Sequence, residues 1–129
     1  MKRINYIEED KIMNSRTYTG LLSLHIYGEA DDILFLSTLL DPLAEELEWM
    51  KGKNVTVRYW ITDKQVSKED AVEGFVGQLM GIADCEFGAR YTEVTGYLGT
   101  DEELNVGGHD LISELKSAVG KWLILEIDT

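Results

Sequence analysis

Positive charge is what this sequence has least of. It carries 12 lysine and arginine residues against 24 aspartate and glutamate residues, which gives a formal net charge of −12. Residues 17–50, 69–89 and 91–115 contain no lysine or arginine and hold seven, five and six of the acids. Such a field repels nucleic acid and anionic membranes, so the composition excludes both as direct partners and favours a cationic one.

Cysteine and long apolar runs are also scarce, and each shortage excludes a class of protein. The single Cys85 cannot form an internal disulfide, which indicates a reducing compartment. No stretch reaches the roughly 20 apolar residues of a membrane span. The basic start is followed by Glu8-Glu9-Asp10 rather than an apolar segment, so we expect no signal peptide and a cytoplasmic protein. One cysteine and two histidines do not supply the usual ligands of structural zinc, and we expect no metal or other cofactor.

What remains is ordinary for a folded domain. The 129 residues are 44% apolar, with no internal repeat and no linker rich in proline, glycine or serine. A chain of this length buries enough surface for one core. We expect one globular domain over residues 1–129, with residues 1–15 as an extended N-terminal arm.

Apolar periodicity predicts an α+β or small α/β sandwich of about four strands, with about three helices packed on the sheet. Alternating patterns predict strands at 16–27, 54–62, 86–98 and 121–127. Spacings of three and four predict helices within 31–50 (interrupted at Pro42), over 67–82 and over 110–119, with a helical turn at 100–103. We expect the helix at 67–82 to bury Val72, Phe75, Val76, Leu79 and Ile82.

The most enzyme-like segment is Gly107-Gly108-His109-Asp110. Glycines ahead of a helix can present backbone N–H groups to an anion, and His109 could move a proton with Asp110 or Glu114 orienting it. No lysine or arginine lies nearby to hold a phosphate, and the pattern lacks the ending of a nucleotide-binding loop. His109, Asp110 and Glu114 are the catalytic candidates, but a loop with an aspartate cap explains them equally well. We favour that structural role and a protein that is not an enzyme.

The candidate partner-binding residues come from the acidic stretches and from the strand faces opposite the expected core. Helix capping accounts for many of the acids, but not for the missing bases. Aromatic and arginine side chains are the types that dominate binding hot spots. The candidates are Asp31, Asp32, Glu45, Glu46, Glu48, Asp101, Glu102, Glu103, Arg58, Trp60, Tyr97 and Trp122.

These features favour a small, acidic, non-enzymatic protein-binding module directed at a basic protein. Size and charge suit an inhibitor of the phage or mobile-element type, with a nucleic-acid-handling protein as its target. Two alternatives stay open. One is a small-ligand-binding protein or enzyme centred on the loop from Gly107 to Asp110. The other is a homo-oligomeric structural protein whose exposed sheet face pairs with itself.

Overall fold

The computed structural model describes residues 15–27, 30–92 and 97–129. The expected N-terminal arm lies outside these ranges except for Ser15, which begins the first strand. Seven strands form an antiparallel sheet in the order β2-β1-β7-β3-β4-β5-β6. They are β1 (Ser15–Tyr27), β2 (Ala30–Leu36), β3 (Asn54–Thr62), β4 (Phe75–Thr92), β5 (Tyr97–Val106), β6 (His109–Asp110) and β7 (Trp122–Asp128).

Helical structure is sparse in the described ranges. It consists of two short α-helices, α2 (Leu43–Glu46) and α3 (Leu111–Lys116), and three 3₁₀ turns, η1 (Glu48–Met50), η2 (Lys68–Asp70) and η3 (Val72–Gly74). The predicted α+β or α/β sandwich of four strands and three helices is therefore wrong, because the described chain is mainly antiparallel sheet. None of its helices is both long and apolar enough to cross a membrane.

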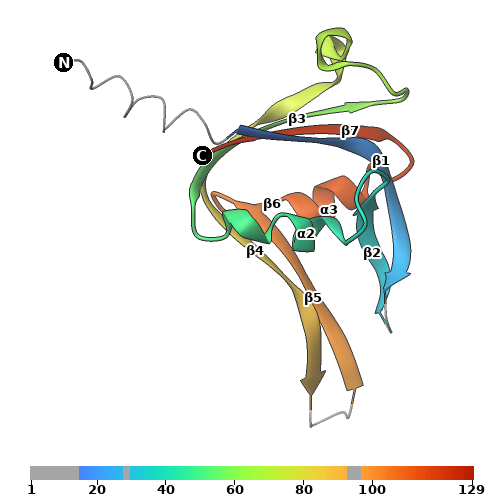
Figure 1. Cartoon of the computed structure of the whole chain (residues 1–129), viewed down its shortest axis with the longest axis vertical. Coiled ribbons are helices and arrows are strands. Elements are labelled where there is room, and N and C mark those ends of the chain that lie inside the picture. The colour runs from blue at the N-terminus through green and yellow to red at the C-terminus, as the bar shows by residue number, and fades with distance from the viewer. Residues whose placement is uncertain (1–14, 28–29, 93–96) are drawn as a thin grey trace, which may run out of the picture.

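The sheet is strongly bent and encloses the two helices. Strands β1, β7 and β3 form one limb, while the long strands β4 and β5 run away from it as a second limb (Figure 1). Helices α2 and α3 lie in the hollow between the limbs, and residues 63–74 form a lobe on the opposite side of the sheet (Figure 1). We call the side facing the helices the inner face and the other the outer face.

The core fills the inner face. In β3 the side chains alternate, with Val55, Val57 and Tyr59 buried and Thr56 and Arg58 turned outward, as a strand with one covered face requires. Other fully buried residues come from further strands, from both helices and from the segment after α2; they include Leu22, Leu34, Leu36, Leu104, Leu123, Leu125 and Ile127, with Leu43, Leu47, Met50, Leu111 and Leu115.

The carboxylate of Glu102 in β5 links this strand to β2 and to α3 across the hollow. Leu34 in β2 donates its backbone N–H to Glu102 Oε2 at 2.8 Å, and Lys116 Nζ lies 2.7 Å from Glu102 Oε1. The Glu102 side chain is only 7% exposed. Glu102 therefore satisfies a backbone donor on one edge strand and anchors α3 at the same time.

The largest error of the sequence prediction concerns residues 67–82. Val72, Phe75, Val76 and Leu79 have helical spacing, but the segment forms η2, η3 and the start of β4 instead. Its glycines, at positions 74, 77 and 81, each weaken a helix by up to about 1 kcal/mol, whereas β3 offers a full ladder of hydrogen bonds. Phe75 is 48% exposed, so the predicted buried stripe is also wrong.

Other elements were predicted with mixed success. Strand β3 has the predicted bounds, and Asp110 caps α3 by accepting a hydrogen bond from Ser113 N. The expected helix at 31–50 begins instead as β2, and α2 starts only after Pro42. The expected helical turn at 100–103 lies within β5, and the expected strand at 86–98 is split between β4 and β5.

Candidate functional site

The outer face of β3 and β7 carries carboxylates that are paired with cations. Arg58 donates from Nη1 to Glu126 at 3.0 Å and to Asp128 at 2.9 Å, and Lys68 Nζ lies 2.7 Å from the second oxygen of Glu126. The hydrogen bond from Arg58 is the main cause that lowers the pKa of Asp128 below its usual value. We call Arg58, Lys68, Glu126 and Asp128 the paired network.

Trp60 lies beside this network on the same face. Its ring packs against Phe75 at a centroid distance of 5.4 Å, and the Lys68 ammonium lies 5.7 Å from its ring centroid. Arg58 and Trp60 were both predicted as partner-binding residues. The structure places them on the outer face, but Arg58 is engaged within the chain.

The outer face of β4 and β5 carries carboxylates that form no ion pair with a described lysine or arginine. Asp84 and Glu86 are exposed on β4, and Glu86 stands directly opposite Glu103 of β5. Glu48 comes from η1 on the inner side of the sheet and accepts a hydrogen bond from Phe87 N of β4 at 3.1 Å. Among the residues that the structure describes, none of these four carboxylates pairs with a lysine or arginine. We call Glu48, Asp84, Glu86 and Glu103 the acidic junction, and its members come from all three base-free stretches.

Three acids of the junction, from three segments of the chain, lie near the buried thiol of Cys85. Burial is the main cause that raises the Cys85 pKa to about 12. Asp84, Glu48 and Glu103 raise it further, while Lys51 acts in the opposite direction. Cys85 is therefore a packing residue and not a reactive thiolate.

Helix α2 adds two more acids beside Glu48, and Asp41, just before the helix, adds a third. Burial raises the pKa of Glu45, and the charges of Asp41, Glu48 and Glu46 raise it further. Glu45 Oε1 is buried and has no hydrogen-bond partner among the described residues. The predicted binding residues Glu45, Glu46 and Glu48 therefore form one group in space.

Apolar side chains lie next to the acidic junction on the outer face of β4. Phe75 and Val76 are nearly half exposed, and Met80 and Ile82 are 66% and 57% exposed. Phe75, Met80 and Ile82 are paired with the outward residues of β3, and the same face of β4 continues directly into Asp84 and Glu86. We call Phe75, Val76, Met80 and Ile82 the apolar stripe. The sequence interpretation missed it, because helical spacing had assigned Phe75, Val76 and Ile82 to a core.

The remaining predicted binding residues are scattered over the sheet. Asp32 is exposed in β2 with a φ of 57°, and Asp31 precedes it. Asp101 and Tyr97 stand opposite Gly88 and Thr92 in the β4–β5 ribbon. Trp122 begins β7, on the outer face.

The catalytic candidates do come together. Tyr59 donates its hydroxyl hydrogen to Glu114 Oε2 at 2.8 Å, and His109 Nε2 lies 2.5 Å from Glu114 Oε1. Burial, followed by the bond to Glu114, raises the pKa of Tyr59 above its usual value. Asp110 is committed to the helix cap through Ser113.

The glycines before His109 have a structural explanation. Gly107 has a φ of 58°, and a Cβ built on it would lie 2.4 Å from the Met80 carbonyl oxygen. Gly107 therefore allows the turn after β5 to press against β4, which no other residue permits. The loop is a tight turn, and its glycines need no bound anion to account for them.

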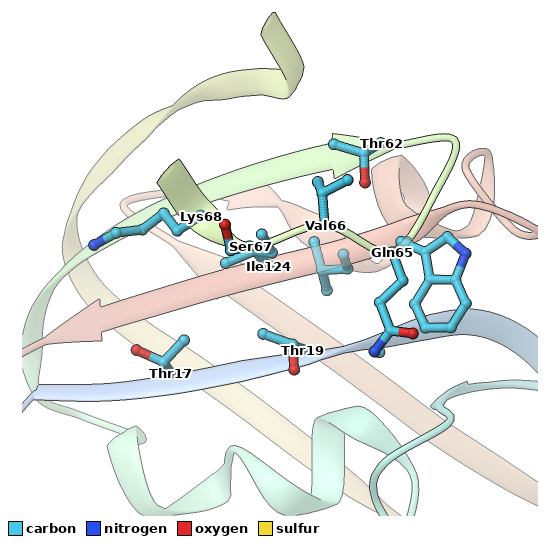
Figure 2. Close-up of a pocket in the computed structure, with 11 residues that line it drawn as sticks. Thr17, Thr19, Thr62, Gln65, Val66, Ser67, Lys68 and Ile124 are labelled. Carbon is cyan, nitrogen blue, oxygen red and sulfur yellow. The ribbon is translucent and has the colours of Figure 1, made fainter. Parts of the chain in front are cut away.

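A groove of about 290 Å³ lies elsewhere on the outer face, under the lobe. Figure 2 shows Thr17 and Thr19 of β1 on one side, Gln65 to Lys68 of the lobe on the other, and Ile124 of β7 between them. Trp122 and Thr62 complete its wall, with Gly20 and Leu123. No pattern in the sequence indicates this groove, because its residues come from three distant segments.

Comparison with known proteins adds no family to these observations. The chain matches no protein-family model, no curated protein and no solved structure.

Among the described residues, no three histidine, cysteine or acidic side chains are grouped so as to hold a metal ion.

Proposed function

We propose that this chain is a non-enzymatic protein-binding module that engages a basic protein through the acidic junction and the apolar stripe. The observation that carries this proposal is the convergence of all three base-free stretches at residues 84–87 of β4, beside exposed apolar side chains. Apolar and aromatic side chains supply contact area in protein interfaces, and complementary charge directs the encounter.

The acidic junction is a poor arrangement for the free protein. Like charges directly opposite each other on neighbouring strands destabilise a sheet, and Glu86 faces Glu103 in this way. Arg58, Lys68, Lys116 and Lys121 pair with carboxylates elsewhere, and Lys51, which lies close enough to lower the pKa of Cys85, forms no ion pair with the junction among the described residues. A lysine or arginine from a partner would supply a paired counter-charge for these carboxylates.

A nucleic-acid-handling protein is the partner class that suits this surface. Its phosphate-binding surface is already basic, so an acidic module can occupy it and block access to nucleic acid. We therefore propose an inhibitor of the phage or mobile-element type. We place the encounter in the cytoplasm, because the one cysteine is a buried free thiol.

An affinity capture with three baits tests the proposal. The baits are the wild-type chain, a junction variant carrying Asp84→Asn, Glu86→Gln and Glu103→Gln, and a control carrying Glu69→Gln, Asp70→Asn and Glu73→Gln. The control acids are exposed in the lobe, and both variants remove three negative charges. Any difference between the variants therefore reports the position of the charge and not its total.

We expect a basic protein to be retained at low salt by the wild type and by the control, and to be lost by the junction variant. Retention of the same proteins by all three baits would overturn the proposal. The competing result is self-association, in which two copies pair through the apolar stripe. Such a dimer would bring the acidic junctions of both copies, which carry the same charge, to one interface. Sedimentation of the free protein as a dimer that Met80→Glu disperses would support that homo-oligomeric alternative instead.

A further inference from the structure

The groove under the lobe differs chemically from the rest of this acidic protein. Its eleven lining residues include no carboxylate, and its one cation, Lys68, already pairs with Glu126. An anionic ligand would have to compete with Glu126 for that amine, and a cationic ligand would find no counter-charge. The lining therefore favours an uncharged ligand.

The polar groups that line the groove fall into two sets. Some are already used, since Thr62 donates to Lys64 O and Ser67 donates to Asp70. The side chains of Thr17, Thr19 and Gln65 make no hydrogen bond with any other described residue, and all three are exposed. Two hydroxyls and an amide offer both donors and acceptors from opposite walls.

The floor and one end of the groove are apolar. Ile124 is only 5% exposed, and Val66 and Trp122 are half-buried. An apolar floor with a few free polar groups at the rim is the usual composition of a small-ligand site. The volume of about 290 Å³ sets the size of the ligand at about one ring.

We propose that this groove binds the pyranose ring of an uncharged sugar. A pyranose presents C–H groups on its faces and hydroxyl groups around its rim, which matches an apolar floor and an indole flanked by free hydroxyl and amide groups. This site is separate from the acidic junction and the apolar stripe, since none of their residues lines it. Sugar binding in this groove is therefore independent of binding to the proposed basic partner.

Nuclear magnetic resonance titration with methyl glycosides of glucose, galactose, mannose and N-acetylglucosamine tests the assignment. The readouts are the indole N–H signal of Trp122 and the backbone signals of residues 17–20. For a ligand of this size we expect saturable shifts with a Kd on the order of millimolar for at least one glycoside. The indole of Trp49 is a built-in reference, because it already donates to the Tyr18 hydroxyl.

Paired variants show whether the free hydroxyls make the contact. Thr17→Val with Thr19→Val keeps the side-chain shape and should weaken binding about tenfold or more by removing two hydrogen bonds. Thr56→Val, on the outer face of β3 and outside the groove, should leave the Kd unchanged within about twofold. The inference is overturned if no glycoside gives saturable shifts, if the Thr17/Thr19 variant binds like the wild type, or if glucuronate, glucosamine or uridine binds more tightly than every neutral glycoside.

Discussion

On the outer face, the carboxylates of one limb of the sheet are paired with cations and those of the other limb are not. On β3 and β7, Glu126 and Asp128 are held by Arg58 and Lys68. On β4 and β5, Glu86 faces Glu103 with no described cation between them. On the outer face, the described cations therefore neutralise acids on one limb only. The net charge of −12 does not reveal this difference. The paired acids support the fold, whereas the unpaired acids are available to a partner.

The contrast depends on the apolar stripe being surface and not core. Phe75→Ala should lower the free energy of unfolding by less than about 1 kcal/mol, because half of the ring is exposed. Leu125→Ala, on the inner face of β7 and fully buried, should lower it by about 2–5 kcal/mol. Urea denaturation of both variants measures the difference, and equal losses would place Phe75 in the core.

Adjacent carboxylates in β5 offer a second and smaller contrast. Glu102→Ala removes the partner of Leu34 N–H and of Lys116, so it should lower the free energy of unfolding by about 1–3 kcal/mol. Glu103→Ala removes a charge opposite Glu86 and should change stability by no more than about 0.5 kcal/mol. If thermal unfolding gives Glu103→Ala the larger loss, the acidic junction is a structural element.

The smallest expected effects on stability have opposite signs at Asp128 and Glu45, and both depend on pH. Arg58 lowers the pKa of Asp128, so that carboxylate stabilises the fold above its unfolded pKa of about 3.9, and the contribution disappears as pH falls through the lower folded pKa. Burial raises the pKa of Glu45, so its charge costs stability at neutral pH, and the cost disappears as pH falls through the raised pKa.

Two substitutions test this reversal. At pH 7, Asp128→Asn should lower stability by about 0.5–1 kcal/mol, while Glu45→Gln should raise it by about 0.2–0.5 kcal/mol. The Glu45→Gln difference should vanish below the unfolded glutamate pKa of about 4.3, and the Asp128→Asn difference should shrink as pH falls from about 3.9 through the lowered folded pKa. Denaturation curves recorded from pH 7 to pH 3 measure them. A destabilising Glu45→Gln at pH 7 would mean that α2 needs this charge.

The sequence predicted part of this fold because some strands carry a local signal. Strand β3 alternates cleanly, and Asp110 precedes α3 with the chemistry of a cap. The segment from Val72 to Leu79 misled because its apolar spacing fits a helix, whereas pairing with β3 decides its structure. Strand pairing over long sequence separations has no local signature, so the seven-strand order could not be read from the chain.

The candidate site was predicted in part for the same reason. The missing bases pointed to Glu48 and Glu103, but only the fold brings them to β4. Glu102 has the same sequence context as Glu103, yet the strand alternation turns it inward to Lys116. We therefore leave Glu102 out of the proposed interface, although sequence alone could not distinguish the two.

The most direct test of the proposed interface is the association rate of the captured basic protein as a function of salt. Steering by charge acts on the encounter and is screened beyond about 8 Å at physiological ionic strength. We predict that the variant carrying Asp84→Asn, Glu86→Gln and Glu103→Gln associates about tenfold more slowly at low salt and loses most of the salt dependence, while the lobe control keeps both. Equal rates and equal salt dependence in the two variants would contradict the account.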